Sequence, residues 1–154
     1  LDPSAGMLAQ AVRQLSIQVV RGVGEQLPLA DSAFDFLSMG YALRHLGDVS
    51  AAFGEFFRVL KPGGAMCLLE ITRPAGRVPL AILKWYMRAL VPLLSRVAAR
   101  TAQSPLLWQY YWDTIEACLP PARVLQAMRD AGFMDVKRGV ELGIFSEYTG
   151  RKPG

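Results

Sequence analysis

Three polar residues near the ends of strand-like segments have side chains suited to ligand binding or catalysis. Asp2 precedes a helix start in "LDPSAGML", and Arg44 and His45 follow the apolar stretch "FDFLSMG". A carboxylate presents acceptor oxygens that match two vicinal hydroxyl groups, although an acidic residue here can also act only as a helix N-terminal charge. Arg44 is a fixed cation able to stabilise a developing anion, and His45 can accept a proton. A packing or hydrogen-bonding role is the alternative for His45.

A glycine pair follows the strand-like segment "IQVV" in the stretch "RGVGEQLP". It does not complete a dinucleotide motif, because Leu27 stands at the third glycine position of GxGxxG and no helix follows to receive a phosphate. A plain turn explains most such pairs, whereas a glycine also lets a ligand approach the backbone closely. The residues alone therefore favour a turn at Val23 and Gly24 over a ligand loop.

The elements that must position these residues alternate between strands and helices. The patterns predict strands at 17–20, 34–40, 65–71 and 134–142, with a last strand within 143–152. They predict helices from the Ser4 cap through Leu15, from Asp48 or Ser50 to "KPGG" (61–64), within 77–117 with breaks at Pro92 and Pro105, and from Pro121 to Gly132. The continuously apolar 65–71 segment predicts a strand buried on both faces. These patterns predict an α/β fold with helices on both sides of a parallel sheet and with an antiparallel C-terminal strand.

The composition indicates one globular domain. The chain has 154 residues, of which 52% are hydrophobic and 19% charged, which excludes a disordered chain. The net charge of +4 comes from scattered Lys and Arg, which argues against a nucleic-acid partner and points to an acidic one such as an anionic lipid surface. Cys67, Cys118 and His45 are too few soft ligands for a zinc site, so we expect no metal and a cytoplasmic location.

Several motifs together resemble the class I S-adenosylmethionine-dependent methyltransferases. "EFFRVLKPGGAMCLLEI" resembles the helix, turn and fifth strand of that superfamily, "LDPSAGML" the end of the second strand, and "GEQLPLADSAFDFLSMG" the adenine loop and fourth strand. Within it, "YALRHLGD", "LLEITRP", "YYWDTIEACLP" and "LGIFSEYTGRK" are similar to motifs of the quinone C-methyltransferases of menaquinone and ubiquinone synthesis. The resemblance covers nearly the whole chain. It implies a Rossmann-like sheet and S-adenosylmethionine as cofactor.

The resemblance also assigns cofactor-binding roles to individual residues. It implies that Asp2 binds the ribose of S-adenosylmethionine and that Met7 lies against the adenine, a core position being the alternative. Val23 and Gly24 stand where the family has a polar and then a small residue in the adenine loop. Because Val23 has no side-chain acceptor, the Gly24 N–H is the expected contact to the base. Gly40, where the quinone branch usually has Ser, is expected to line the site through its backbone.

The implied reaction is methylation of a ring carbon in a prenylated quinol precursor. Arg44 would then stabilise the phenolate, and His45 would remove the ring proton, although the quinone branch has Asn at this position. Glu70 is a weaker candidate for the base, with an ion pair to Arg73 as its alternative. "ALRHLGD" also resembles the A-L-H-H-L-x-D of general small-molecule methyltransferases. An enzyme that methylates oxygen or nitrogen of another small hydrophobic molecule therefore stays open.

Residues 78–94 are apolar, but Lys84 and Arg88 interrupt them and prolines bracket them. A segment that crosses a membrane needs about 20 apolar residues, so we expect a helix that covers the substrate or touches the inner face of the membrane. An ordinary core helix fits the same periodicity.

The family's glycine-rich loop, D-x-G-x-G-x-G, has no counterpart in the sequence. We therefore expect residues 1–154 to be the C-terminal portion of a methyltransferase domain, truncated before the body of its second strand. A non-catalytic fragment that binds no cofactor is the third functional alternative. The sheet would then have an unpaired edge, which predicts marginal stability or pairing with a second copy as a homodimer.

Overall fold

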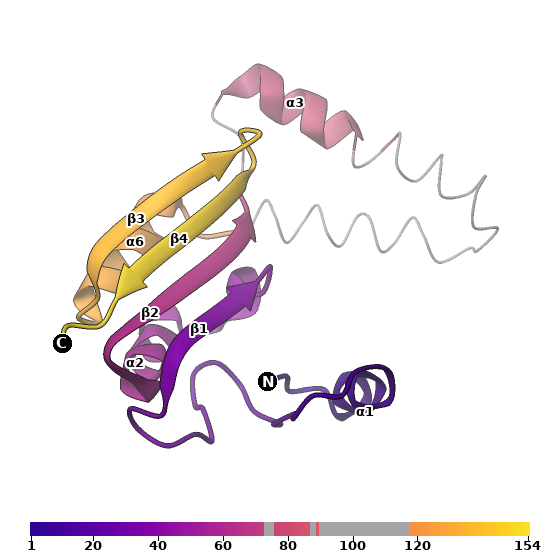
Figure 1. Cartoon of the computed structure of the whole chain (residues 1–154). Coiled ribbons are helices and arrows are strands. Elements are labelled where there is room, and N and C mark those ends of the chain that lie inside the picture. The colour runs from indigo at the N-terminus through magenta and orange to yellow at the C-terminus, as the bar shows by residue number, and fades with distance from the viewer. Residues whose placement is uncertain (73–75, 87–88, 90–117) are drawn as a thin grey trace.

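The described part of the chain contains a mixed sheet of four strands. The computed structural model describes residues 1–72, 76–86, 89 and 118–154. The strands β1 (Phe34–Gly40), β2 (Leu60–Ile71), β3 (Met134–Glu141) and β4 (Phe145–Arg151) lie in the order β1-β2-β4-β3 (Figure 1). β1 and β2 are parallel, and β4 is antiparallel to both of its neighbours. The predicted α/β fold with an antiparallel C-terminal strand is confirmed.

Short-range signals place the starts of α1, α2 and α6 and the end of α6. The described helices are α1 (Ala5–Gln14), α2 (Val49–Val59), α3 (Arg77–Trp85), α6 (Pro121–Asp130) and the short 3-10 helix η1 (Leu43–His45). Ser4 caps α1 and Asp48 caps α2, each through its side-chain oxygen. Pro121 occupies the first turn of α6, and Gly132 follows its end with a φ of 100°. These predicted boundaries are therefore confirmed.

The core lies between one face of the sheet and the helices α2 and α6, which pack behind it in Figure 1. Met66 and Leu68 of β2 are fully buried there, whereas Leu69, on the opposite face, is 41% exposed. The prediction that this strand is buried on both faces is therefore wrong for the described residues. Its apolar run reflects one packed face and one face that no described helix covers.

Two other predicted boundaries need correction. Residues 17–20 form no strand; the Val20 carbonyl accepts one hydrogen bond, from the Asp2 N–H at 3.3 Å. α2 ends at Val59, and "KPGG" belongs to β2 instead of a turn. The Gly63 N–H donates to the Lys152 carbonyl at 3.0 Å, and the Lys152 N–H donates to the Gly64 carbonyl at 2.9 Å. These hydrogen bonds to the C-terminal end of the chain hold residues 63–64 in the first part of β2.

The predicted helical region 77–117 is described only at its beginning. α3 exposes Ile82 and Trp85, and Tyr86, which caps its C-terminal end, is exposed as well. None of the described helices is long and apolar enough to cross a membrane. The predicted breaks at Pro92 and Pro105 lie outside the described residues.

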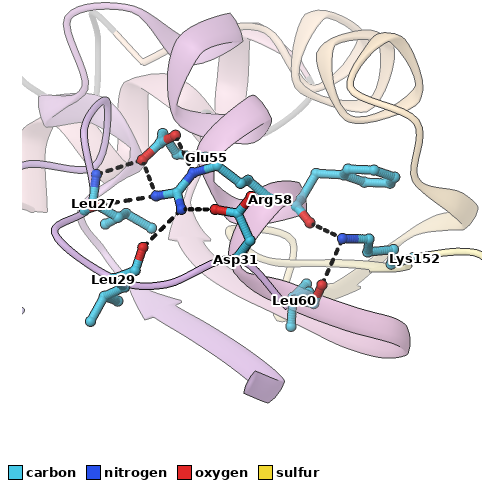
Figure 2. A network of polar contacts seen from close by, with 8 residues as sticks. Leu27, Leu29, Asp31, Glu55, Arg58, Leu60 and Lys152 are labelled. Carbon is cyan, nitrogen blue, oxygen red and sulfur yellow. Dashed lines mark hydrogen bonds and ion pairs between the residues drawn. The ribbon is translucent and has the colours of Figure 1, made fainter. Parts of the chain in front are cut away.

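Arg58 fixes the segment that precedes β1 onto α2 (Figure 2). Its guanidinium donates to the carbonyls of Leu27 and Leu29 at 3.0 and 2.8 Å, and it pairs with Asp31 and Glu55. Glu55 also accepts the Leu27 N–H at 2.7 Å. At the same, C-terminal end of α2, Lys152 donates to two carbonyls, those of Phe57 and Leu60, at 2.8 and 2.7 Å. The planar fork of Arg58 thus replaces the regular backbone bonds that this irregular segment lacks.

The Glu55 carboxylate makes the stability of the fold depend on pH. The hydrogen bonds from Arg58 lower the pKa of Glu55 below its ordinary 4.5, and the desolvation that opposes them is smaller. A carboxyl group with a lowered folded-state pKa stabilises the fold fully above its unfolded pKa, and this contribution is lost as the pH falls through the folded value. We therefore expect Glu55→Gln to lower the urea midpoint of unfolding at neutral pH. Below about pH 4.5, the urea midpoint of this variant should fall less steeply with decreasing pH than that of the wild type. Urea titrations between about pH 3 and pH 7 measure both effects.

The exposed Glu141→Gln is the matched control, because Glu141 lies on the edge strand β3. If the urea midpoint fell equally steeply with decreasing pH in Glu55→Gln and in the wild type, Glu55 would not be the source of this pH dependence.

Candidate functional site

The N-terminal residues hold the Asp2 carboxylate in a defined position. Asp2 exchanges two backbone hydrogen bonds, both of 3.3 Å, with Val20 and Gly22. Its Oδ1 accepts the Ser4 N–H at 2.7 Å. This bond fixes the direction of the carboxylate and leaves Oδ2 without a hydrogen bond from the described residues. Asp2 can therefore both start the turn into α1 and offer an oxygen to a ligand.

Gly24, the second residue of the glycine pair, and Glu25 form a tight turn that packs against the segment after β1. Val23 and Gln26 form an isolated antiparallel bridge around it. A Cβ atom added to Gly24 would lie 2.7 Å from Leu46 Cδ2, closer than real Cβ contacts. The predicted turn is therefore confirmed, and a side chain at Gly24 would require the Leu46 methyl group to move.

A cavity of about 380 Å³ brings these segments together. It lies between the N-terminal residues, the turn at Val23 and Gly24, strand β1 and the residues that follow it. The residues that line it are Leu1, Asp2, Pro3, Gly22, Val23, Gly24, Glu25, Leu27, Leu29, Phe34, Phe36, Leu37, Ser38, Met39, Ala42, His45, Leu46, Phe56 and Val59. Of the predicted site residues, the cavity unites Asp2, Val23, Gly24 and His45. Met7, Gly40 and Arg44 do not line it.

The cavity has the properties of a nucleoside-sized ligand site. Its volume falls in the usual range for small-molecule and cofactor sites, about 300–1,000 Å³. Phe34, Phe36 and Met39 give it an apolar wall, and Asp2 gives it a carboxylate acceptor. The Gly24 N–H donates to none of the described groups. A flat apolar base with a donor and acceptor edge, joined to a sugar with two hydroxyls, fits this set of groups.

Two residues that the motifs assign to the site, Met7 and Gly40, lie away from the cavity, and one that they do not assign, Ser38, lines it. Met7 is 61% exposed on α1, which has no buried residue. Gly40 ends β1 in open space, with no atom within 4 Å of the place where a Cβ would lie. Ser38, which sequence analysis missed, lines the cavity two residues earlier. The signal for Ser38 is its hydroxyl near the carboxyl end of a parallel strand, where ligands of open α/β sheets bind.

Arg44 and Glu70 form a buried ion pair next to the cavity. Arg44 Nη1 lies 2.6 Å from Glu70 Oε1, and the two side chains are 5% and 0% exposed. Glu70 Oε2 also accepts the backbone N–H of Arg44 at 3.3 Å, and Oε1 accepts the Ile71 N–H at 2.8 Å. The carboxylate thus holds both the side chain and the backbone of Arg44. The alternative partner considered for Glu70, Arg73, lies outside the described residues.

One hydrogen-bond donor of this ion pair has no acceptor in the described part of the chain. Arg44 Nε is buried and has no hydrogen-bond partner among the described residues. A buried unsatisfied donor costs about 1–3 kcal/mol, so an acceptor at this point would bind favourably.

Cys118 lies close enough to this pair to sense its charges. Burial, and to a lesser extent the negative charge of Glu70, raises the pKa of the Cys118 thiol to about 11, although the positive charge of Arg44 opposes the shift. The thiol therefore stays protonated at neutral pH, which makes it a poor nucleophile.

The sequence profile of the ubiE/COQ5 methyltransferase family matches residues 4–152. A demethylmenaquinone methyltransferase of Roseiflexus sp. (strain RS-1) is 34% identical over 144 residues, which cover 93% of this chain and 59% of the relative. One of Mycobacterium marinum is 33% identical over 153 residues, or 99% of this chain and 64% of the relative. The chain thus spans about 60% of the length of these curated relatives.

Solved structures share the fold at lower identity. A SAM-dependent methyltransferase of Methanosarcina mazei superposes with a TM-score of 0.60 at 20% identity, covering 99% of this chain and 80% of that one. Phosphoethanolamine N-methyltransferase 2 of Haemonchus contortus, solved with S-adenosylhomocysteine, gives 0.65 at 11% identity, covering 99% and 43%. Likeness at this identity shows the fold alone, which is that of class I SAM-dependent methyltransferases.

The buried pair predicts a large effect of removing one charge. Glu70→Gln would leave the Arg44 guanidinium buried without its counter-charge, which typically costs about 3–5 kcal/mol. We expect that loss in the free energy of unfolding from urea titration, and about a third or less of it in the exposed Glu147→Gln on β4. A double variant, Arg44→Met with Glu70→Met, should regain much of the stability because it removes both charges. Equal losses for Glu70→Gln and Glu147→Gln would show that the pair does not stabilise the fold.

Proposed function

Because the chain belongs to the ubiE/COQ5 methyltransferase family, we propose that it carries part of the site of an enzyme that transfers a methyl group from S-adenosylmethionine to a ring carbon of a prenylated quinol precursor. The observation that carries the proposal is the cavity, which unites Asp2, the Val23–Gly24 turn and His45 from three separate segments. The name of the Roseiflexus and Mycobacterium relatives, demethylmenaquinone methyltransferase, supports the quinone ring as acceptor.

The residues of the cavity divide the binding of the cofactor between them. Asp2, through Oδ2, would accept hydrogen bonds from the ribose hydroxyls, and the Gly24 N–H would donate to the base. Val23 and the phenylalanines of β1 would contact the base through their apolar surfaces. Met7 and Gly40 would then contribute no direct contact. When bound, S-adenosylmethionine supplies a methyl group on a sulfonium centre, which is already activated for transfer.

The remaining residues would act on the acceptor. Arg44 is held by Glu70 at 2.6 Å, and its fixed positive charge would favour phenolate character in the ring. His45 lines the cavity, so it would accept the ring proton after the new carbon–carbon bond has formed, directly or through water. The protein would thus orient donor and acceptor and leave the activation of the methyl group to the cofactor.

The acceptor is apolar and dissolves in membranes, and α3 has features that would bring the protein to it. Its exposed Ile82, Trp85 and Tyr86 lie near Lys84, a combination typical of segments that bind the surface of an anionic bilayer. We propose that α3 makes peripheral contact with the cytoplasmic face of the membrane. We also propose that two copies of the protein pair as a homodimer, which a measurement of its mass in solution tests.

Loss of the Asp2 charge should weaken cofactor binding without disturbing the fold. A charge-assisted hydrogen bond contributes about 1.5–3 kcal/mol, so we expect Asp2→Asn to raise the Kd for S-adenosylhomocysteine about 10- to 100-fold. Isothermal titration calorimetry measures the Kd, with Asp130→Asn as control because Asp130 is an exposed carboxylate at the end of α6. An unchanged affinity in Asp2→Asn would rule out the ribose contact.

Arg44 and His45 should affect turnover more than cofactor affinity. We expect Arg44→Lys, which keeps the charge opposite Glu70 but loses the guanidinium fork, to lower kcat for a demethylmenaquinol analogue about 10²- to 10³-fold. His45→Gln should lower kcat about 10²- to 10⁴-fold. Mass spectrometry of the product measures turnover, and its fragments distinguish a methyl group on carbon from one on oxygen. Full turnover in both variants would refute these roles, and an oxygen-methylated product would refute the proposed reaction.

A further inference from the structure

Glu25 connects the turn at Val23 and Gly24 to the segment that follows His45. Its Oε1 accepts the backbone N–H of Gly47 at 2.6 Å and that of Asp48 at 3.4 Å. The two segments are separated by more than twenty residues in sequence, and no strand pairing joins them. One half-buried carboxylate therefore sets the distance between them.

A second contact between the same two segments lies beside the first. Leu46 Cδ2 is 2.7 Å from the place where a Cβ on Gly24 would lie, and Phe56 of α2 packs against the same point. Adjacent residues of one turn, Gly24 and Glu25, thus touch consecutive residues of the other segment, Leu46 and Gly47. A shift of either segment would have to break an apolar contact and a charge-assisted hydrogen bond at once.

We propose that Glu25 is a positioning residue that couples the turn at residues 22–26 to residues 43–48, so that a cofactor bound in the cavity fixes His45 and Arg44 for the acceptor. The inference rests on the proposed function. His45 lies only two residues before Gly47, and the Glu70 carboxylate holds Arg44 from the other side. The segment between these two anchors is short, so a change at Gly47 is transmitted to His45 through few rotatable bonds.

Helix capping is the simpler role that has to be separated from this one. A carboxylate near the start of α2 interacts favourably with the helix dipole, whatever binds in the cavity. Asp48 already caps this helix by accepting the Ala51 N–H at 3.0 Å, and the Asp48 side chain makes no hydrogen bond to the turn at residues 22–26. Asp48→Ala is therefore a matched control, since it removes a cap at the same helix end and leaves the Glu25 link in place.

The experiment measures how one ligand changes the affinity for the other. The Kd of a short-tailed demethylmenaquinol analogue is determined with and without saturating S-adenosylhomocysteine, in the wild type, Glu25→Ala, Glu25→Gln and Asp48→Ala. Allosteric coupling of this kind amounts to about 5-fold or more in affinity. We expect such a gain in the wild type and in Asp48→Ala, less than about 2-fold in Glu25→Ala, and an intermediate gain in Glu25→Gln, which keeps a neutral acceptor oxygen.

Each outcome decides between the roles. Wild-type coupling in Glu25→Ala, or an equal loss of coupling in Asp48→Ala, would overturn the proposal and leave Glu25 as a capping residue. If Glu25→Ala does not fold, Glu25→Gln provides the test, and full coupling in that variant with its neutral oxygen would likewise contradict a charge-dependent link. A wild type that binds both ligands without mutual effect overturns the coupling alone. A wild type that binds neither overturns the proposed function.

Discussion

A fully buried carboxylate, Glu70, constrains the arrangement around the carboxyl ends of the parallel strands. A buried carboxylate requires a cation and hydrogen-bond donors within reach, and Arg44 supplies the cation while two backbone N–H groups supply further donors. This requirement holds the 3-10 turn after β1 against the end of β2. The direction of that turn places His45 at the cavity and Arg44 beside it. The need of the buried Glu70 carboxylate for a cation and donors thus determines where Arg44 and His45 lie.

Helix α2 is the common support for the irregular segments of the chain. Glu25 attaches the turn at residues 22–26 to its start. Arg58 attaches the segment before β1 to its last turn, and Lys152 attaches the C-terminal end of the chain just beyond that turn (Figure 2). In each case a charged side chain satisfies backbone groups that have no partner in regular secondary structure. The cavity therefore depends on side-chain hydrogen bonds to one helix as much as on the sheet.

Local signals in the sequence predicted the helix caps at Ser4 and Asp48, the start of α6 at Pro121 and the final hairpin, because each depends on neighbouring residues. Motif resemblance predicted that Asp2 and His45 serve one site, and the cavity brings them together. The partners of Glu70 and Glu25 could not be predicted, since they lie more than twenty residues away and any N–H or cation could have served. Residues 17–20 failed as a strand because apolar character alone supplies no neighbouring strand to pair with.

The sequence contains a single histidine, and the fold places it in the wall of the cavity. Imidazole ring protons resonate apart from most other signals in a proton NMR spectrum, so no other residue of this chain gives the same pair of lines. The site thus carries its own reporter without an added label. Arrival of a ligand, a change of protonation and a movement of the neighbouring turn would all be visible at one position in the spectrum.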